Sequence, residues 1–383
     1  MTIFPPLGLY IHFPWCVRKC PYCDFNSHAV DGAIPEQAYI DALLADLELD
    51  LTSVGSRRIE TIFMGGGTPS LFSPGAIRRL IDGIAARVEL AADAEITLEA
   101  NPGTVEAGRF EGYRQAGVNR LSMGIQSFND DHLRRLGRIH SGAEARAAAA
   151  MARDAGFDNF NLDLMFGLPE QTPDDARADV EQALTLQPTH VSFYQLTLEP
   201  NTLFHRYPPV LPGEDTTWQI QQTCQAVLKE SGFVQYEVSA YAQEGRRCRH
   251  NLNYWQFGDY LGIGAGAHGK FMAAGGAVLR CWKHKQPQQF LKLAGTPECR
   301  GGAHRVSTED LPVEFLMNHL RLRDGFALRT YTELTGLTPE SLEPGLSRAV
   351  EHGLLDQTRG VIRCTDTGWN FLDNVLMQFL PAE

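Results

Sequence analysis

The sequence lacks the features of a secreted or membrane protein. No uninterrupted apolar stretch approaches the ~18 residues that suggest a membrane-spanning helix. The first sixteen residues, MTIFPPLGLYIHFPWC, have neither the basic start nor the clean apolar run of a signal peptide. We therefore expect a cytoplasmic protein, in which thiols stay reduced. Its eight cysteines are then ligands, core residues or isolated side chains, and not a disulfide framework.

Positive charge is also scarce. The chain has 34 Lys and Arg residues against 46 Asp and Glu residues, a formal net charge of −12. That balance disfavours non-specific binding to nucleic acid or anionic lipid, so we expect neither as a partner. With 383 residues and 43% hydrophobic side chains, the chain is long enough for about two or three globular domains.

What the chain does contain is a regular alternation of β-rich and helical segments. Strands are expected over 8–13, 60–67, 94–102, 119–128, 157–169 and 189–200, and helices over 35–51, 73–89, 142–157 and 172–186. Each helix returns the chain so that the next strand can lie parallel to the last. The sequence therefore predicts an α/β fold in which six βα units form an open or partial (β/α)6 barrel. Polar and glycine-rich residues follow these strands, at the rim where α/β folds bind ligands.

Three cysteines stand close together as C-x3-C-x2-C, at Cys16, Cys20 and Cys23. Structural zinc usually needs four protein ligands, and no second C-x2-C occurs in the chain, although His12 or His28 could complete a zinc site. Isolated core cysteines are the remaining structural alternative. A four-iron cluster held by three thiolates instead leaves one iron with an open position for a small-molecule ligand. The spacing favours this iron–sulfur interpretation.

Several longer motifs resemble one family. C-x3-C-x2-C after a first strand, with a glycine-rich turn after the second, resembles the radical S-adenosylmethionine (radical SAM) superfamily, in which SAM binds the open iron of a [4Fe–4S] cluster and can be cleaved to a radical. LYIHFPWC, GGGTPS, LEANP, RLSMGIQSF and NLDLMFGLPEQT narrow the resemblance to the oxygen-independent coproporphyrinogen III oxidase family. CDFNSH and HNLNYW are typical of its heme chaperone (HemW) branch. The likeness runs from about residue 8 to the C-terminus.

The resemblance implies roles for individual residues. The three cysteines would ligate the cluster, Tyr10 would contact the bound SAM, and Tyr22 would pack against its adenine. Gly66, Gly67 and Thr68 would present backbone groups to the methionine end, because glycine lets a ligand approach closely and free amides bind a carboxylate.

Four further polar residues are implied in SAM binding. Glu99 suits a ribose hydroxyl or an ammonium group. Gln126, Arg138 and Asp163 match a second SAM position of the oxidase branch, and whether one or two SAM molecules bind stays open.

The heme chaperone branch implies a further motif, H-N-x-x-Y-W, here His250, Asn251, Tyr254 and Trp255. Imidazole can ligate heme iron and flat rings can pack on the macrocycle. The structural alternative is a loop whose aromatic rings fill the core. Weaker candidate ligands are Cys248 and His268.

The region after about residue 300 has a different character. Helical segments are followed by a short hairpin, LLDQTRGVIRCTDTG, and a last helix, a winged-helix-like order. Residues 308–383 carry six basic and twelve acidic residues, which is the wrong sign for reading DNA. We expect a small lid or packing domain over 301–383, after a core barrel over 1–240 and a heme-motif extension and linker over 241–300.

Two functions of different class remain. The first is a heme chaperone that binds heme, a [4Fe–4S] cluster and exchangeable SAM and passes heme to an acceptor protein, with an electron donor if the cluster is reduced. The second is an enzyme, an oxygen-independent coproporphyrinogen III dehydrogenase. The oxidase branch carries a further cysteine where this chain has Phe25, and a long segment before its motif, which here begins at residue 16. Together with HNLNYW, these differences favour the chaperone without oxidase activity; whether SAM is cleaved stays open.

Overall fold

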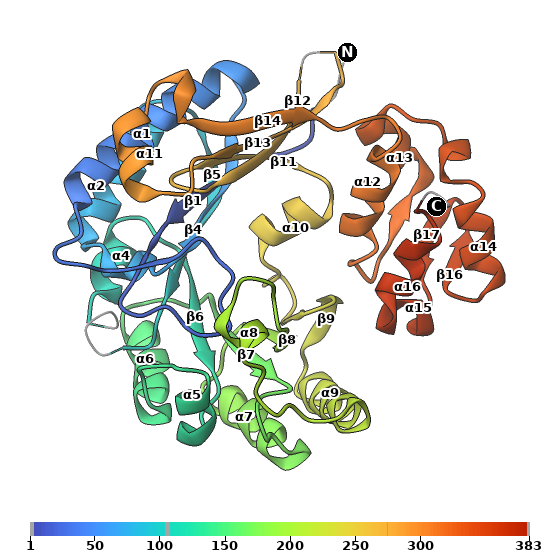
Figure 1. Ribbon diagram of the computed structural model, residues 1–383, viewed down its shortest axis with the longest axis horizontal. Helices are drawn as coiled ribbons and strands as arrows, with labels where there is room; N and C mark the ends of the chain where they lie inside the picture. Colours follow the sequence, from blue (N-terminus) through green and yellow to red (C-terminus); the bar gives the residue numbers. More distant parts are fainter. Residues whose placement is uncertain (1–3, 104–107, 274, 381–383) are drawn as a thin grey trace.

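A computed structural model describes residues 4–103, 108–273 and 275–380. Its main feature is a twelve-stranded sheet that curves into an open barrel with helices on its outer face (Figure 1). The six predicted parallel strands lie side by side in chain order and confirm the partial barrel. They are β1 (Leu7–Phe13), β4 (Ile59–Gly66), β5 (Leu90–Ala100), β6 (Arg120–Gln126), β7 (Phe160–Phe166) and β8 (His190–Gln195).

The helices that return the chain begin at residues suited to capping them. Ser141 and Thr172 each accept a hydrogen bond from the third backbone N–H of the helix that follows, forming capping boxes. The first of these helices buries alanines against the sheet, which lets it pack closely. The crossover helices are α1 (Glu36–Val54), α2 (Pro74–Ala85), α4 (Phe110–Gln115), α5 (Asp130–Arg135), α6 (Gly142–Asp154), α7 (Pro173–Thr185) and α9 (Glu214–Glu230).

Residues after β8 extend both edges of the sheet. One edge gains β10 (Ala240–Ala242) and β9 (Val234–Glu237), and the other gains β11 (Asp259–Ile263), which pairs in parallel with β1. The antiparallel strands β12 (His268–Met272), β13 (Val278–Lys283) and β14 (Arg300–Arg305) follow. Figure 1 shows α10 (Arg249–Trp255) between the two edges, where it contacts β1, β4 and β11.

A buried ion cluster ties this extension to the barrel. Lys283 at the end of β13 is fully buried and pairs with Asp46 and Asp50 of α1, its Nζ lying 2.8 Å from Asp50 Oδ2. A buried lysine is stable only with such partners, because burial without them leaves its charge unsolvated.

The C-terminal residues form a second core around Phe315 and Tyr331. The predicted hairpin is present as β16 (Leu355–Thr358) and β17 (Val361–Cys364), joined by β15 (Phe326–Ala327) into a three-stranded wing. Its helices are α12 (Leu311–His319), α13 (Leu328–Thr335), α14 (Gly345–Glu351), α15 (Asp366–Asn370) and α16 (Leu372–Met377). Among the described residues, no helix combines the length and apolar character needed to span a bilayer.

Candidate functional site

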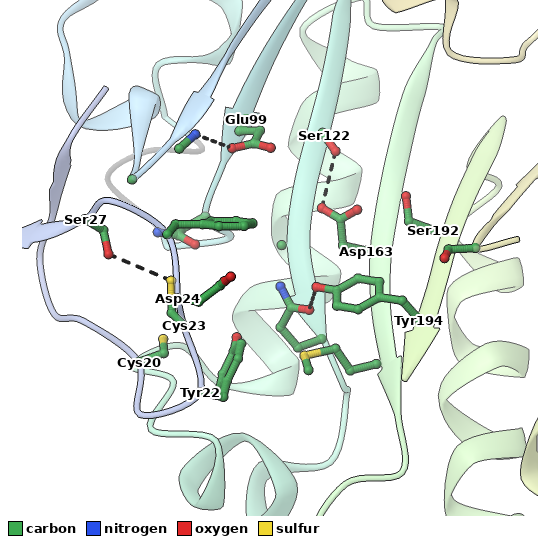
Figure 2. Close-up of a pocket in the computed structure, with 18 of the residues that line it drawn as sticks. Cys20, Tyr22, Cys23, Asp24, Ser27, Glu99, Ser122, Asp163, Ser192 and Tyr194 are labelled. Carbon is green, nitrogen blue, oxygen red and sulfur yellow. Dashed lines mark hydrogen bonds between the residues drawn. The ribbon is translucent and has the colours of Figure 1, made fainter. Parts of the chain in front are cut away.

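The predicted site residues gather around a cavity of about 580 Å³ at the carboxyl ends of the parallel strands. It is bounded by the cysteine loop and by the ends of β4 to β8 (Figure 2). Residues from α10 and the C-terminal domain complete its lining. Three predicted site residues, Tyr10, His250 and Tyr254, do not line it. Those that do are Cys16, Cys20, Tyr22, Cys23, Gly66, Gly67, Thr68, Glu99, Gln126, Arg138, Asp163, Asn251 and Trp255.

The cysteine loop is held in shape by backbone pairing and by one asparagine. β2 (Trp15–Cys16) pairs with β3 (His28–Ala29), so the loop leaves and returns at the same place. The Asn26 side-chain nitrogen donates to the carbonyl oxygens of Ala265 at 2.9 Å and Lys285 at 2.8 Å. The loop is thereby anchored to residues far along the chain, and its three thiols are half-buried at the cavity wall.

The three thiols fit a [4Fe–4S] cluster better than a single metal ion. Burial raises the pKa of the Cys16 and Cys23 thiols, so thiolates here need nearby positive charge such as bound iron. In the part of the chain that the structure describes, no three His, Cys, Asp or Glu side chains converge on one ion. A [4Fe–4S] cluster does not require the three thiolates to converge on one ion, because each thiolate binds a different iron.

The two histidines considered for zinc have other partners. His12 Nδ1 lies 3.0 Å from the Tyr10 hydroxyl, and its Nε2 lies 2.8 Å from the Asn26 carbonyl oxygen. His28 Nε2 lies 3.2 Å from the Asn26 side-chain oxygen. Tyr10 is thus part of the barrel interior, where it also stacks on Phe63, and not of the cavity wall.

The glycine-rich turn after β4 is held in place by hydrogen bonds within the protein. Gly66 has φ of 105°, and a Cβ there would lie 2.3 Å from the His12 ring, so only glycine fits. Its N–H donates to Glu99, while those of Gly67 and Thr68 donate to carbonyl oxygens of Phe13 and Trp15.

All three amides of the turn thus donate within the protein in this structure. The expected contact of this turn with the methionine end of SAM stays a prediction. The turn clamps β4 to the segment that leads into Cys16.

A chain of hydrogen bonds connects two of the cysteines. The Thr68 hydroxyl donates to Cys16 Sγ at 3.5 Å, and Asn101 donates to that hydroxyl oxygen at 3.0 Å. Arg138 donates to the Asn101 side-chain oxygen at 2.7 Å and to Cys20 Sγ at 3.7 Å. Asn101 stands with Glu99 at the predicted ligand-binding rim at the end of the third strand, although the sequence assigned it no specific role.

Opposite the cysteine loop stands a wall of acidic and polar side chains (Figure 2). Burial and the neighbouring Asp163 raise the pKa of Glu99 to about 8. Burial also raises the pKa of Asp163, which accepts a hydrogen bond from Asn161 at 2.7 Å. The Tyr194 hydroxyl donates to Gln126 Oε1 at 2.7 Å. The wall can thus offer a neutral carboxyl group as a donor, or a carboxylate to a cation.

The predicted heme motif is divided between two environments. His250 is fully buried, and both ring nitrogens face hydroxyl groups, Nδ1 at 2.8 Å from Thr61 Oγ1 and Nε2 at 2.9 Å from the Tyr254 hydroxyl. Burial lowers the pKa of His250 to about 3, so the ring is neutral. Asn251 and Trp255 line the cavity. In this arrangement His250 has no free nitrogen for heme iron.

The two weaker heme candidates lie elsewhere. Cys248 is buried and donates to Glu95 at 3.6 Å. His268 stacks on Trp282, with ring centroids 6.2 Å apart, and does not line the cavity.

The side of the cavity next to α10 is completed by residues that the sequence did not single out. Arg321, between α12 and β15, donates to Glu237 Oε2 at 2.9 Å and lies over the Trp255 ring, 4.3 Å from its centroid. Neither Arg321 nor Glu237 belongs to a recognisable motif, because the two meet only when the C-terminal domain docks beside β9.

Comparisons with known proteins identify relatives over the whole chain. The sequence profile of the Radical SAM superfamily matches residues 10–183, and that of the HemN C-terminal domain matches residues 306–371. A protein named "Heme chaperone HemW" from Escherichia coli K12 is 50% identical over 380 residues, covering 99% of this chain and all of that protein. A protein of the same name from Haemophilus influenzae is 48% identical and covers 100% of both.

A more distant relative and a solved structure also match most of the chain. "Radical S-adenosyl methionine domain-containing protein 1, mitochondrial" from Bos taurus is 37% identical, covering 97% of this chain and 87% of that protein. The solved structure of coproporphyrinogen III oxidase (HemN) from Escherichia coli has a TM-score of 0.82 at 24% identity, covering 98% of this chain and 90% of that one. At that identity the match shows a shared fold.

Proposed function

The chain belongs to the HemW family within the radical SAM superfamily, and from that membership we propose that it is a heme chaperone. It would bind heme together with a [4Fe–4S] cluster and SAM, and pass the heme to an acceptor protein. The observation that carries the proposal is the full-length match, at 50% identity, to a protein named as a heme chaperone. Phe25, in place of the further cysteine of the oxidase branch, supports it; this side chain is exposed and lines the cavity.

Different residues of the cavity would hold the cluster and SAM. Cys16, Cys20 and Cys23 would hold the cluster, which supplies an iron with an open coordination position and can supply an electron. Arg138 places a positive charge beside Cys20, with its Nη1 3.7 Å from the sulfur. The wall of Glu99 and the other polar side chains opposite would hold SAM.

Heme binding requires a change at α10. The neutral imidazole of His250 is the form that ligates iron, but it must leave Thr61 or Tyr254 to do so. Trp255 already lines the cavity and can pack against a flat macrocycle. We therefore propose that α10 loosens when heme binds, exchanging one of these two internal hydrogen bonds for an iron–nitrogen bond.

The main alternative is coproporphyrinogen III dehydrogenase activity, and one assay separates it from the chaperone. Cluster-loaded protein is incubated anaerobically with coproporphyrinogen III, SAM and a reductant, and porphyrin products are separated by chromatography, with Cys20→Ser as the control. We expect no vinyl-bearing product, together with saturable heme binding followed by the Soret band. Product above the control level, from protein without heme affinity, would establish the enzyme instead.

Three features of the cellular setting are part of the same proposal. We propose that the protein works in the cytoplasm, that an electron donor reduces its cluster when reduction is needed, and that the acceptor is a heme-requiring protein. Mixing heme-loaded protein with an apo-hemoprotein and following the Soret band of the acceptor tests the transfer step.

A further inference from the structure

We propose that Arg321 is a carboxylate-binding residue of the cavity, placed to pair with a propionate group of heme packed near Trp255. The inference rests on the proposed function and adds a residue outside the H-N-x-x-Y-W motif. It also gives the C-terminal domain a direct part in ligand recognition.

The surroundings of Arg321 suit the binding of a flat, negatively charged ligand. Its guanidinium lies on the Trp255 indole, and both side chains line the cavity. Glu237 and Asn251 line it on the same side, from β9 and α10. A heme molecule combines a flat apolar ring with two carboxylates, which matches an aromatic face next to a guanidinium.

The Arg321 guanidinium has N–H groups that are not all paired with an acceptor in the described part of the chain. Only its Nη2 has a carboxylate partner, Glu237 Oε2, and its Nε is buried with no partner among the residues that the structure describes. A buried donor without an acceptor is unfavourable, so a ligand carboxylate entering here gains hydrogen bonds that the protein leaves unmade. Arginine can also bind a carboxylate through two nitrogens at once.

The attachment of the C-terminal domain to the barrel does not depend on the Arg321 side chain alone. The same segment is already fixed by backbone contacts: Leu322 forms a β-bridge with Glu237, and the Arg323 N–H donates to the Tyr236 carbonyl oxygen at 3.1 Å. The side chain of Arg321 thus remains available for another task.

The other arginines lining the cavity are placed differently. Arg138 is committed to Asn101, Gly124 and Cys20, and Arg18 lies on the exposed part of the cysteine loop. Among the three arginines that line the cavity, Arg321 is therefore the one placed beside Trp255.

A matched control lies two residues away. Arg323 also pairs with a carboxylate, Asp366, at 2.7 Å and lies over an indole, that of Trp369, 3.3 Å from its centroid. It does not line the cavity. Arg321→Gln and Arg323→Gln thus remove the same kinds of contact, one inside the cavity and one outside it.

The test compares heme with its dimethyl ester, in which both propionates are blocked. Binding to full-length, cluster-loaded protein is measured by absorbance titration. We expect wild type and Arg323→Gln to prefer free heme by about tenfold, the value of a charge-assisted hydrogen bond, and Arg321→Gln to lose the preference. Glu237→Gln removes the competing carboxylate and should increase the preference.

The outcomes separate the inference from the proposed function. Wild type that binds neither porphyrin overturns both. If wild type prefers heme over the ester and Arg321→Gln keeps that preference, only the role of Arg321 is overturned. If Arg321→Gln does not fold, a decreased preference in Glu237→Gln overturns that role instead.

SAM affinity is measured in parallel, because SAM also carries a carboxylate. A loss of SAM binding in Arg321→Gln with heme preference unchanged would assign the residue to SAM and refute the inference.

Discussion

Glu99 is expected to lose a proton when SAM binds. Its pKa of about 8 means that about nine in ten molecules carry this proton at pH 7. SAM brings a sulfonium charge into the cavity, and a nearby positive charge lowers the pKa of a carboxyl group. The Glu99 carboxyl group then carries a proton in the free protein and loses it in the SAM complex. Because binding releases a proton, the affinity for SAM rises with pH. We expect an increase of about tenfold from pH 6 to pH 7, levelling off above pH 8.

Calorimetry can count this proton directly. SAM is titrated into cluster-loaded wild type and Glu99→Gln in two buffers of different ionisation enthalpy, at pH 7. The amino group of SAM can release a proton of its own when it ligates iron, so the difference between the two proteins isolates Glu99. We expect wild type to release about 0.9 proton more than the variant. Equal proton release, or wild-type affinity that does not depend on pH between 6 and 8, would refute the reasoning.

Three further substitutions test the site and its support. Cys20→Ser should lose the visible absorbance and iron content of the cluster while the circular dichroism of the fold stays unchanged. Gly66→Ala forces a side chain into a left-handed backbone and against the His12 ring, and should lower the free energy of unfolding in urea by about 1–3 kcal/mol. Lys283→Met leaves the buried Asp46 without its cation and Asp50 with Arg300 alone, and should lower it by about 3–5 kcal/mol.

Each of these has a control in the same chain. Cys364→Ser replaces a cysteine of the C-terminal domain and should keep full iron content. Gly75→Ala, on α2, adds a Cβ with no atom within 4 Å, so stability should be unchanged or slightly higher. Lys292→Met changes a partly exposed lysine of the outer surface and should have little effect. Equal losses in a variant and its control would remove the proposed cause.

The elements of the barrel were predictable because their signals are local. The run expected as a strand over 8–13 is β1, and the helix expected over 172–186 is α7, which Thr172 caps. Alternating strands and helices restrict the topology strongly, since parallel neighbours need a crossover. The polar strand ends then meet at one rim, which is why most of the expected site residues do line one cavity.

What could not be predicted depends on partners that are distant in sequence. The amides of Gly67 and Thr68 donate to carbonyl groups of the segment before Cys16, and no local pattern encodes that pairing. His250 is enclosed through Thr61, 189 residues earlier. Arg321 carries no motif, because its position depends on how the C-terminal domain docks. Sequence patterns identify the chemistry of single side chains better than they identify the groups those side chains contact.

The anchoring of Asn26 has a consequence for how the protein is made. The cysteine loop is among the first parts of the chain to be synthesised, but the carbonyl groups that hold Asn26 lie 239 and 259 residues later. β1, which precedes the loop, likewise pairs with a strand that ends at Ile263. The nascent chain therefore presents its three thiols on an unanchored segment until residue 285 has left the ribosome. Cluster assembly in the final geometry is accordingly a late event, which follows synthesis of most of the barrel.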